Sequence, residues 1–175
     1  MKVLLFLALF LKSAPLLADA PACDESASKP LAFRTIASSD TVTARIRGNP
    51  CSKAVLTIQI TSDTGKLIYR YGARFTKHIS MDSDDPELPS YAAELVKRIA
   101  DQDEIETTDS LPPWLPRDDY YEQHNNVIKV PQSTYEQLKR QKRPIFSHPT
   151  YHEGWRSLIY DPNTKKAQTL FEGGV

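Results

Sequence analysis

Apolar and polar residues alternate most regularly between residues 54 and 75, where the sequence reads AVLTIQITSDTGKLIYRYGARF. On both sides of the SDTG segment every second residue is apolar, which is typical of a strand with one buried face. Asp63 can accept a hydrogen bond from the backbone two residues on, and Gly65 can take the positive φ of a type I turn followed by a bulge. The pattern therefore predicts a β-hairpin.

Two segments before this hairpin also have the composition of strands. Residues 41–47, TVTARIR, alternate with a period of two, and residues 31–36, LAFRTI, can form a short strand. The segment GNPC at 48–51 has the residues of a turn. Together these segments predict a meander of about three or four antiparallel strands over residues 31–75.

A second hairpin is predicted near the C-terminus. Residues 156–160 and 166–172 flank the sequence DPNT, in which Pro162 sets the first corner of a type I turn and Asp161 caps it. We expect this hairpin to extend the sheet of the meander.

Two segments between the hairpins have the period of a helix. Residues 91–102 follow Ser90, a good helix cap, and residues 133–143 open with a capping box, S-x-x-E, and end before Pro144. The apolar stripe of the first helix consists of Ala92, Leu95, Val96 and Ile99.

The order of these elements, strands first, then helices, then strands, indicates an α+β fold. We expect an antiparallel meander sheet of about five to six strands with two helices packed on one face. A chain of 175 residues is long enough for one domain of ordinary size, and residues 23–175 are predicted to form it.

The first 22 residues have the form of a secretory signal peptide. Lys2 precedes an apolar run from Val3 to Leu11, and small residues follow at the spacing of a cleavage site after Ala20 or Ala22. The run is nine residues long, whereas a membrane-spanning helix needs about 20. We therefore expect residues 1–22 to be removed, leaving a periplasmic or secreted protein without a transmembrane span.

The two cysteines, Cys23 and Cys51, allow two interpretations that exclude each other. An oxidising compartment permits a disulfide between them, which would tie the mature N-terminus to the start of the hairpin. Alternatively, Cys23 would be the lipid anchor of a lipoprotein, although Ala20 stands where such signals usually have a leucine. That alternative leaves Cys51 as a free thiol.

The balance of charge argues against a nucleic-acid partner. Removal of Lys2, Lys12 and Asp19 with the signal leaves 20 basic and 21 acidic residues. Proteins that bind the phosphate backbone need an excess of basic residues, so no nucleic acid is expected as a partner.

The segment 103–126 has little periodicity and is long for a loop in a small domain, which is typical of loops that are functional or mobile. Its LPPWLP sequence at 111–116 should be stiff and extended, presenting Trp114 for contact at little entropic cost. The alternative is that Trp114 folds back to cover an open sheet face. The predicted partner-binding residues, here and in the loop before the last hairpin, are Trp114, Tyr120, Tyr121, Tyr151, His152 and Trp155.

No motif of nucleotide binding, serine hydrolysis or dithiol chemistry is present, so no catalytic residue, cofactor or metal is predicted. The strongest alternative is a zinc site in a loop, at His148 and His152 with Glu153 or His124 as the third ligand. Two histidines four residues apart can share an ion on a helix, but Pro149 disfavours the helical conformation of His148.

These observations predict a small exported protein of the bacterial envelope that binds an envelope or secreted protein, as an inhibitor, an immunity-type neutraliser or an assembly accessory. The alternative is a periplasmic hydrolase, metal-dependent if it uses His148, His152 and Glu153. A third class is a structural envelope component that pairs through an open sheet edge.

Overall fold

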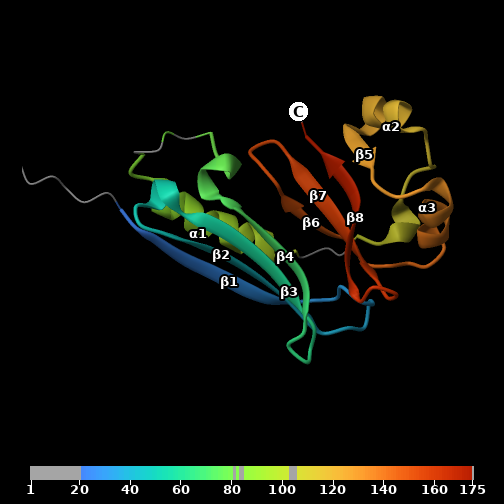
Figure 1. The fold of residues 1–175 in the computed structure, drawn as a ribbon, viewed down its shortest axis with the longest axis horizontal. Coiled ribbons are helices and arrows are strands. Elements are labelled where there is room, and N and C mark those ends of the chain that lie inside the picture. Colours follow the sequence, from blue (N-terminus) through green and yellow to red (C-terminus); the bar gives the residue numbers. More distant parts are fainter. Residues whose placement is uncertain (1–20, 81, 83–84, 103–105, 175) are drawn as a thin grey trace, which may run out of the picture.

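Two antiparallel sheets of four strands each organise the described part of the chain (Figure 1). The computed structural model describes residues 21–80, 82, 85–102 and 106–174, apart from the side chains of Arg117 and Tyr120. The first sheet has the order β1-β2-β3-β4 and comprises β1 (Cys23–Leu31), β2 (Asp40–Gly48), β3 (Val55–Thr61) and β4 (Leu67–Arg74). The second has the order β5-β8-β7-β6 and comprises β5 (Asn126–Ile128), β6 (Phe146–Pro149), β7 (Trp155–Asp161) and β8 (Lys166–Gly173).

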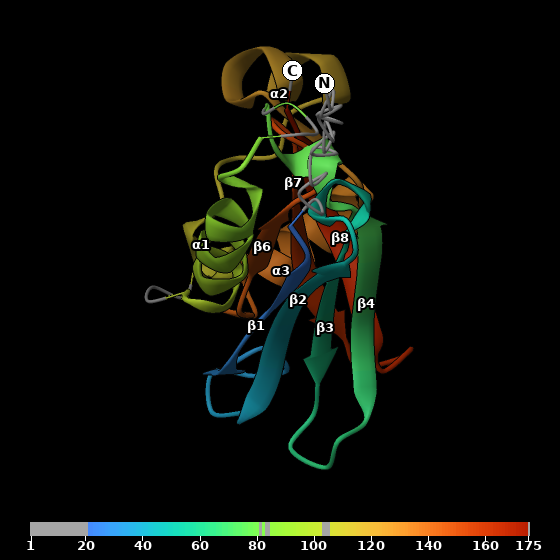
Figure 2. The ribbon, with the colours of Figure 1, turned by 90° about the vertical axis from the view of Figure 1, so that its left-hand side faces the viewer.

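The first sheet buries one face and leaves the other to solvent. Alternate residues of β2 and β3 are fully buried on one side: Val42, Ala44, Ile46, Leu56, Ile58 and Ile60. The helix α1 (Leu88–Ala100) covers β1 and β2 on this side with its buried stripe of Ala92, Leu95, Val96 and Ile99. Figure 2 shows α1 along the sheet. The predicted amphipathic stripe is thus the contact between helix and sheet.

The second sheet lies between two hydrophobic cores. Phe146 of β6 and Leu158 of β7 belong to the core of the first sheet. Ile159 of β7 and Leu170 of β8 belong to a second core, which also contains Tyr135 of the helix α3 (Gln132–Lys139). Consecutive residues of β7 are therefore buried on both faces of the sheet.

A 3₁₀ turn packs against α3, and the described side chains of a further helix lie outside both cores. The 3₁₀ turn Thr108–Ser110 lies against α3, where the buried Thr108 hydroxyl donates to the carbonyl of Leu138 (2.5 Å). The amide of Arg143 donates to the same hydroxyl at 2.9 Å. The helix α2 (Arg117–His124) precedes β5 and ends at Asn125, whose φ of 53° places it in the left-handed region.

A disulfide joins Cys23, the first residue of β1, to Cys51 in the 3₁₀ turn Cys51–Lys53. The two Cα atoms are 4.8 Å apart, and both residues are buried. The predicted pairing is therefore present, and it uses the sulfur that a lipid anchor on Cys23 would need. The predicted signal peptide lies outside the described residues, except for Pro21 and Ala22.

The predicted α+β class is confirmed, but several elements differ from expectation. The second hairpin forms a separate sheet and does not extend the meander. A third helix, α2, and the strand β1 occur in segments where no such element was predicted. The helix α3 begins at Gln132 after Pro131 and has no side-chain cap, so the predicted capping box at Ser133 does not form.

None of the helices formed by the described residues combines the length and the apolar composition that crossing a bilayer requires.

Candidate functional site

Three of the predicted partner-binding residues meet around one surface groove of about 410 Å³, which we call the aromatic groove. Tyr121 comes from α2, Tyr151 from the turn after β6, and Trp155 from the start of β7. Tyr121 and Tyr151 are 42% and 40% exposed, among the most exposed large apolar residues of the described chain. The groove is lined by Tyr71, Tyr121, Val127, Thr150, Tyr151, Trp155, Arg156, Glu172, Gly173 and Gly174.

Tyr151 is held in place by a tight turn and by two glycines. The amide of Thr150 donates to the carbonyl of Gly154 at 2.8 Å, which closes the turn around Tyr151. The ring lies so close to Gly154 and Gly174 that a Cβ atom on either would collide with it. The Tyr71 hydroxyl donates to the carbonyl of Thr150 at 2.7 Å and ties this turn to the first sheet. The exposed tyrosine therefore sits on a fixed base.

Trp155 is positioned by pairing at the end of the second sheet. It pairs with Gly173 of β8, where the absence of a side chain leaves room for the indole. The indole Nε1 donates to Oδ1 of Asn126 in β5 at 2.8 Å. The side chain is thus fixed between three segments and remains partly exposed.

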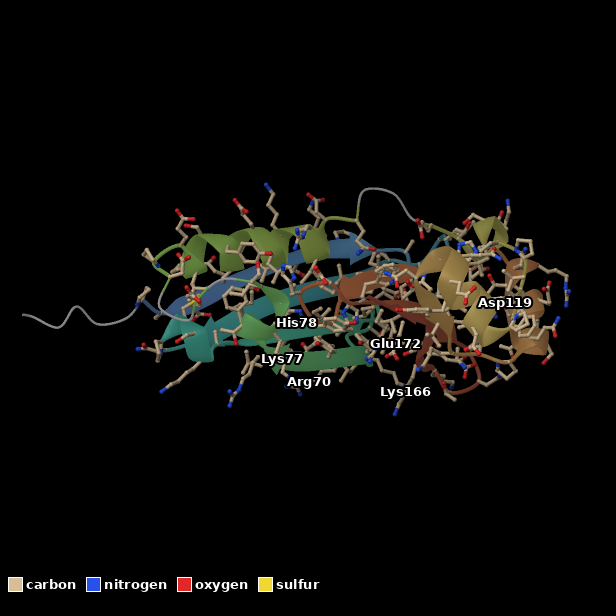
Figure 3. The ribbon with its side chains drawn as sticks, turned by 90° about the horizontal axis from the view of Figure 1, so that it is seen from above. Arg70, Lys77, His78, Asp119, Lys166 and Glu172 are labelled. Atoms are coloured by element: carbon tan, nitrogen blue, oxygen red, sulfur yellow. A yellow bond between two sulfur atoms is a disulfide. The ribbon has the colours of Figure 1, made fainter. Side chains whose placement is uncertain are left out.

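An ion-pair network forms the polar side of the aromatic groove. Arg156 of β7 and Glu172 of β8 are cross-strand partners, and Nε and Nη2 of Arg156 donate to the same carboxylate oxygen at 2.9 and 2.5 Å. Lys129 binds the other oxygen at 3.0 Å. Burial by itself would raise the pKa of Glu172, but the hydrogen bonds from Lys129 and Arg156 outweigh it and lower this pKa. Glu172 is therefore ionised at neutral pH, and Figure 3 shows its position in the middle of the molecule.

His148 of β6 joins the two sheets beside Tyr71. It is 2% exposed, its Nε2 lies 2.7 Å from the Tyr69 hydroxyl, and its Nδ1 lies 2.9 Å from the carbonyl of Pro149. Burial disfavours the charged ring and lowers the pKa of His148 to about 4, so the imidazole is neutral at pH 7. A neutral ring that donates from Nδ1 to Pro149 leaves Nε2 to accept from Tyr69.

This arrangement separates the residues of the alternative metal site. His148 is buried and already bonded, whereas the side chains of His152 and Glu153 are 46% and 60% exposed. The two exposed side chains lie 3.9 Å apart between Nδ1 and Oε1. Among the described residues, no three His, Cys, Asp or Glu side chains come close enough together to hold a metal ion.

A larger cleft of about 710 Å³ lies where α1 ends against the other face of the second sheet. The side-chain amide of Gln102 donates to the carbonyl of Ser147 at 2.6 Å, and the hydroxyls of Ser147 and Ser157 lie 2.8 Å apart on its floor. Trp155 lines both this cleft and the aromatic groove. The remaining lining is half apolar and half polar: Ile99, Leu111, Pro112, Ile145, Pro149 and Phe171 on the one hand, and Arg98, Glu106, Ser110, His124, Asn126 and His148 on the other.

The other predicted contact residues have different positions. Trp114 is partly buried and packs against the second core, as the covering alternative expects. His152 is exposed on the turn beside Tyr151. The side chain of Tyr120 lies outside the described part of the structure.

Sequence reasoning missed Tyr71, Arg156 and Glu172 as members of the groove. Arg156 and Glu172 carry opposite charges on two strands of the predicted hairpin, but the register counted from the turn places Phe171 and not Glu172 opposite Arg156, so this signal alone does not identify the pair. No sequence signal places Tyr71 in the groove, because the hairpin pattern shows only that its side chain faces the core.

Comparison with known proteins adds no family or neighbour: no family model, no curated protein and no solved structure matches this chain.

Proposed function

We propose that this protein is a small exported envelope protein that binds a protein partner through the aromatic groove, as an inhibitor, an immunity-type neutraliser or an assembly accessory. The observation that carries the proposal is the convergence of Tyr121, Tyr151 and Trp155 from three separate segments on one groove. Tyrosine, tryptophan and arginine are the residues that most often dominate the energy of protein interfaces.

The way these rings are held favours binding. Tyr151 is fixed by Gly154 and Gly174, and Trp155 by its hydrogen bond to Asn126, so little side-chain freedom is lost when a partner docks. Two exposed tyrosines on a fixed base offer apolar area together with hydroxyls that can hydrogen-bond.

The predicted location is compatible with the cysteine chemistry. Disulfides persist in oxidising compartments such as the periplasm, and Cys23 is bonded to Cys51 here. This supports an extracellular or periplasmic site of action.

Site-specific photo-crosslinking tests the proposal directly. A photoreactive phenylalanine derivative would replace Tyr121 in the groove or, as a control, the exposed Glu94 on α1, in the native host. We expect a protein adduct of defined mass from position 121 and none from position 94. Equal labelling at both positions, or no adduct from the groove, would contradict the proposal.

A second pair of variants distinguishes specific binding in the aromatic groove from non-specific crosslinking at the protein surface. Tyr151→Ala should reduce the adduct from position 121 by roughly tenfold or more, since a tyrosine that acts as an interface hot spot contributes about 2 kcal/mol or more. Ile36→Ala removes a side chain that is 69% exposed in the loop between β1 and β2, and it should leave the adduct unchanged.

An enzyme acting on a small substrate remains the alternative, and the cleft is the observation that favours it. Its volume of about 710 Å³ lies within the range of small-molecule sites, and both apolar and polar side chains, among them His124 and His148, line it. The metal-dependent form of this alternative gains no support from the cleft, because His152 and Glu153 do not line it. That form predicts stoichiometric metal in protein purified without chelator and its loss in His152→Ala. Folded protein that contains no metal would count against that form of the alternative.

A further inference from the structure

Four arginines lie on the uncovered face of the first sheet, in rows of directly paired residues that cross neighbouring strands. Directly paired residues of neighbouring strands point to the same face of a sheet. Arg47 pairs with Val55, and Val55 with Arg74, so one row across β2, β3 and β4 has an arginine at each end. The burial of Ile46, which alternates with Arg47, shows that this row faces away from the core.

Two parallel rows extend the array. Arg45 pairs with Thr57, and Gln59 pairs with Arg70, so both arginines share the face of Arg47 and Arg74. We call this set of four arginines the basic face. The intervening positions are small or polar: Thr41, Thr43, Thr57, Gln59, Thr61 and Gly72.

The charge on this face is only partly neutralised. Asp24 of β1 is the one acidic residue that the register of the four described strands places on it, and it binds Arg45 at 2.8 Å and Arg47 at 3.7 Å. Arg70 and Arg74 are exposed and form no ion pair with the described residues. The net charge of the whole chain is zero, so the basic face reflects segregation of charge and not an overall excess.

Exposed acidic residues gather on α2, at the end of the molecule that also holds α3 and the exposed basic residues Arg140 and Lys142 (Figure 1). Asp118, Asp119 and Glu122 are exposed on α2, and Figure 3 shows Asp119 far from Arg70 and Lys77.

We infer that the basic face docks on the phosphates of an anionic lipid bilayer. The arginines come from β2 and β4, on either side of β3, and they line an uncovered sheet face and do not converge on a pocket. This arrangement suits phosphates that lie in a plane. Guanidinium groups bind phosphate oxygens through paired hydrogen bonds. Val55 and Leu67 are 45% and 46% exposed, and Val55 lies within the arginine row, where it can reach the boundary between headgroups and acyl chains.

This docking leaves the aromatic groove accessible. Tyr71 pairs with Ile58 and therefore faces the core side of the first sheet, opposite to Arg70. A protein that lies on a membrane through its basic face presents the second sheet and α2 away from the lipid. The inference is independent of whether the groove binds a protein.

Vesicle co-sedimentation tests the inference. The disulfide-bonded protein is mixed with vesicles of phosphatidylcholine alone or with about one third phosphatidylglycerol, at about 0.05 M and 0.5 M salt. We expect binding to the anionic vesicles at low salt, loss of that binding at high salt, and no binding to phosphatidylcholine. Equal binding to both vesicle types would overturn the inference.

Two charge-matched double variants identify the surface. Arg70→Glu with Arg74→Glu reverses two arginines of the basic face, and Lys97→Glu with Arg98→Glu makes the same change on exposed positions of α1. The first variant should bind anionic vesicles roughly thirtyfold or more weakly, since each basic residue near the surface contributes about 1 kcal/mol. The affinity of the second variant for anionic vesicles should fall threefold or less. An equal loss of affinity in both variants would show that the basic face is not the specific binding surface.

A soluble polyanion distinguishes the lipid surface from an acidic protein. If poly-L-glutamate binds through Arg70 and Arg74 while anionic vesicles do not, the occupant is an acidic polypeptide and the membrane assignment is wrong. Thermal melts of both double variants, followed by circular dichroism, establish that they are folded. Crosslinking from position 121 reports on the groove separately from these measurements.

Discussion

Two histidines, His78 and His148, lie in the interior on either side of the ring of Tyr71. The ring centroids of Tyr71 and His148 are 4.9 Å apart, and those of Tyr71 and His78 are 6.0 Å apart. His148 has hydrogen-bond partners, whereas neither ring nitrogen of His78 has one among the described residues. An unsatisfied buried polar group costs roughly 1 to 3 kcal/mol of stability.

Acidification should destabilise the protein through these two residues. Burial lowers the pKa of each histidine from 6.5 to about 4, so between these values the unfolded chain binds protons that the folded protein does not. The free energy of unfolding should be steady above about pH 6.5 and fall toward pH 4, by roughly 2 to 3 kcal/mol per histidine.

Guanidinium denaturation at pH 7.5 and at pH 4.5 measures this loss. His78→Leu should remove about half of it, whereas the exposed His152→Gln should leave it unchanged. A His78→Leu variant with the full pH dependence of the parent protein would show that other groups cause the loss.

The Tyr69 hydroxyl should contribute measurably to the contact between the sheets. Tyr69→Phe removes the group that lies 2.7 Å from Nε2 of His148 and leaves that nitrogen buried without a partner. We expect the free energy of unfolding to fall by about 1 to 2 kcal/mol at pH 7.5. Tyr121→Phe, at an exposed position, is the matched control and should change it by less than about 0.5 kcal/mol.

At the scale of elements, the strand β1 is stabilised mainly by contacts at its two ends and by its neighbours. Its sequence, CDESASKPL, buries only Cys23 and Leu31, and it is an edge strand that pairs with β2 alone. This composition has no alternation of apolar residues, which is why the sequence did not predict a strand there. The disulfide at its first residue and α1 against its side supply the stabilisation that its own side chains lack.

Loss of the disulfide should therefore destabilise the fold strongly. The bond closes a loop with a sequence separation of 28 residues, which corresponds to about 3 to 4 kcal/mol in the chain-entropy model. Cys23→Ala with Cys51→Ala should lower the free energy of unfolding by that amount, as measured by urea denaturation. The parent protein under reducing conditions should match the double variant, and a change below about 1 kcal/mol in both would disprove a stabilising role.

The hairpin of β7 and β8 shows what the alternation of apolar and polar residues can and cannot predict. Its existence and its turn were predicted correctly from the DPNT sequence. Counting outward from the Asp161 and Lys166 pair places Phe171 opposite Arg156, but a bulge beside Ser157 shifts the register and brings Glu172 there. The bulge could not be predicted, because burial on both faces of β7 removes the alternation that marks a register.

The helix α2 was missed for a related reason. It buries none of its described side chains, so its sequence RDDYYEQH has no apolar stripe to indicate a helix. Tyr121 was predicted as a contact residue from its type, but the groove around it depends on the packing of α2 against β5, which pairs with β8, and no local pattern determines this packing.

At the scale of the whole molecule, the second sheet makes the two cores interdependent. Phe146 and Leu158 point into the first core, while Ile159 and Leu170 point into the second. The sequence predicted the α+β class because the order of elements survives in the structure. It did not predict two sheets, since the separation depends on packing between residues far apart in the chain.

A substitution in the second core should consequently destabilise the first. Leu170→Ala creates a cavity at a fully buried site and should cost about 2 to 5 kcal/mol. In native-state hydrogen exchange, the amide of Ile58 in β3 should become less protected by a similar free energy. Unchanged protection at Ile58, with loss confined to the second sheet, would show that the two cores open independently.

The position of Trp155 gives the protein a built-in optical probe. Its indole forms part of the wall between the aromatic groove and the cleft, whereas Trp114, the other of the two tryptophans in the chain, packs on the second core. In a Trp114→Phe background, the emission maximum and quenching of the remaining indole would report occupancy of either surface. Acrylamide quenching before and after a candidate partner or small molecule is added would therefore screen ligands for both sites without any label.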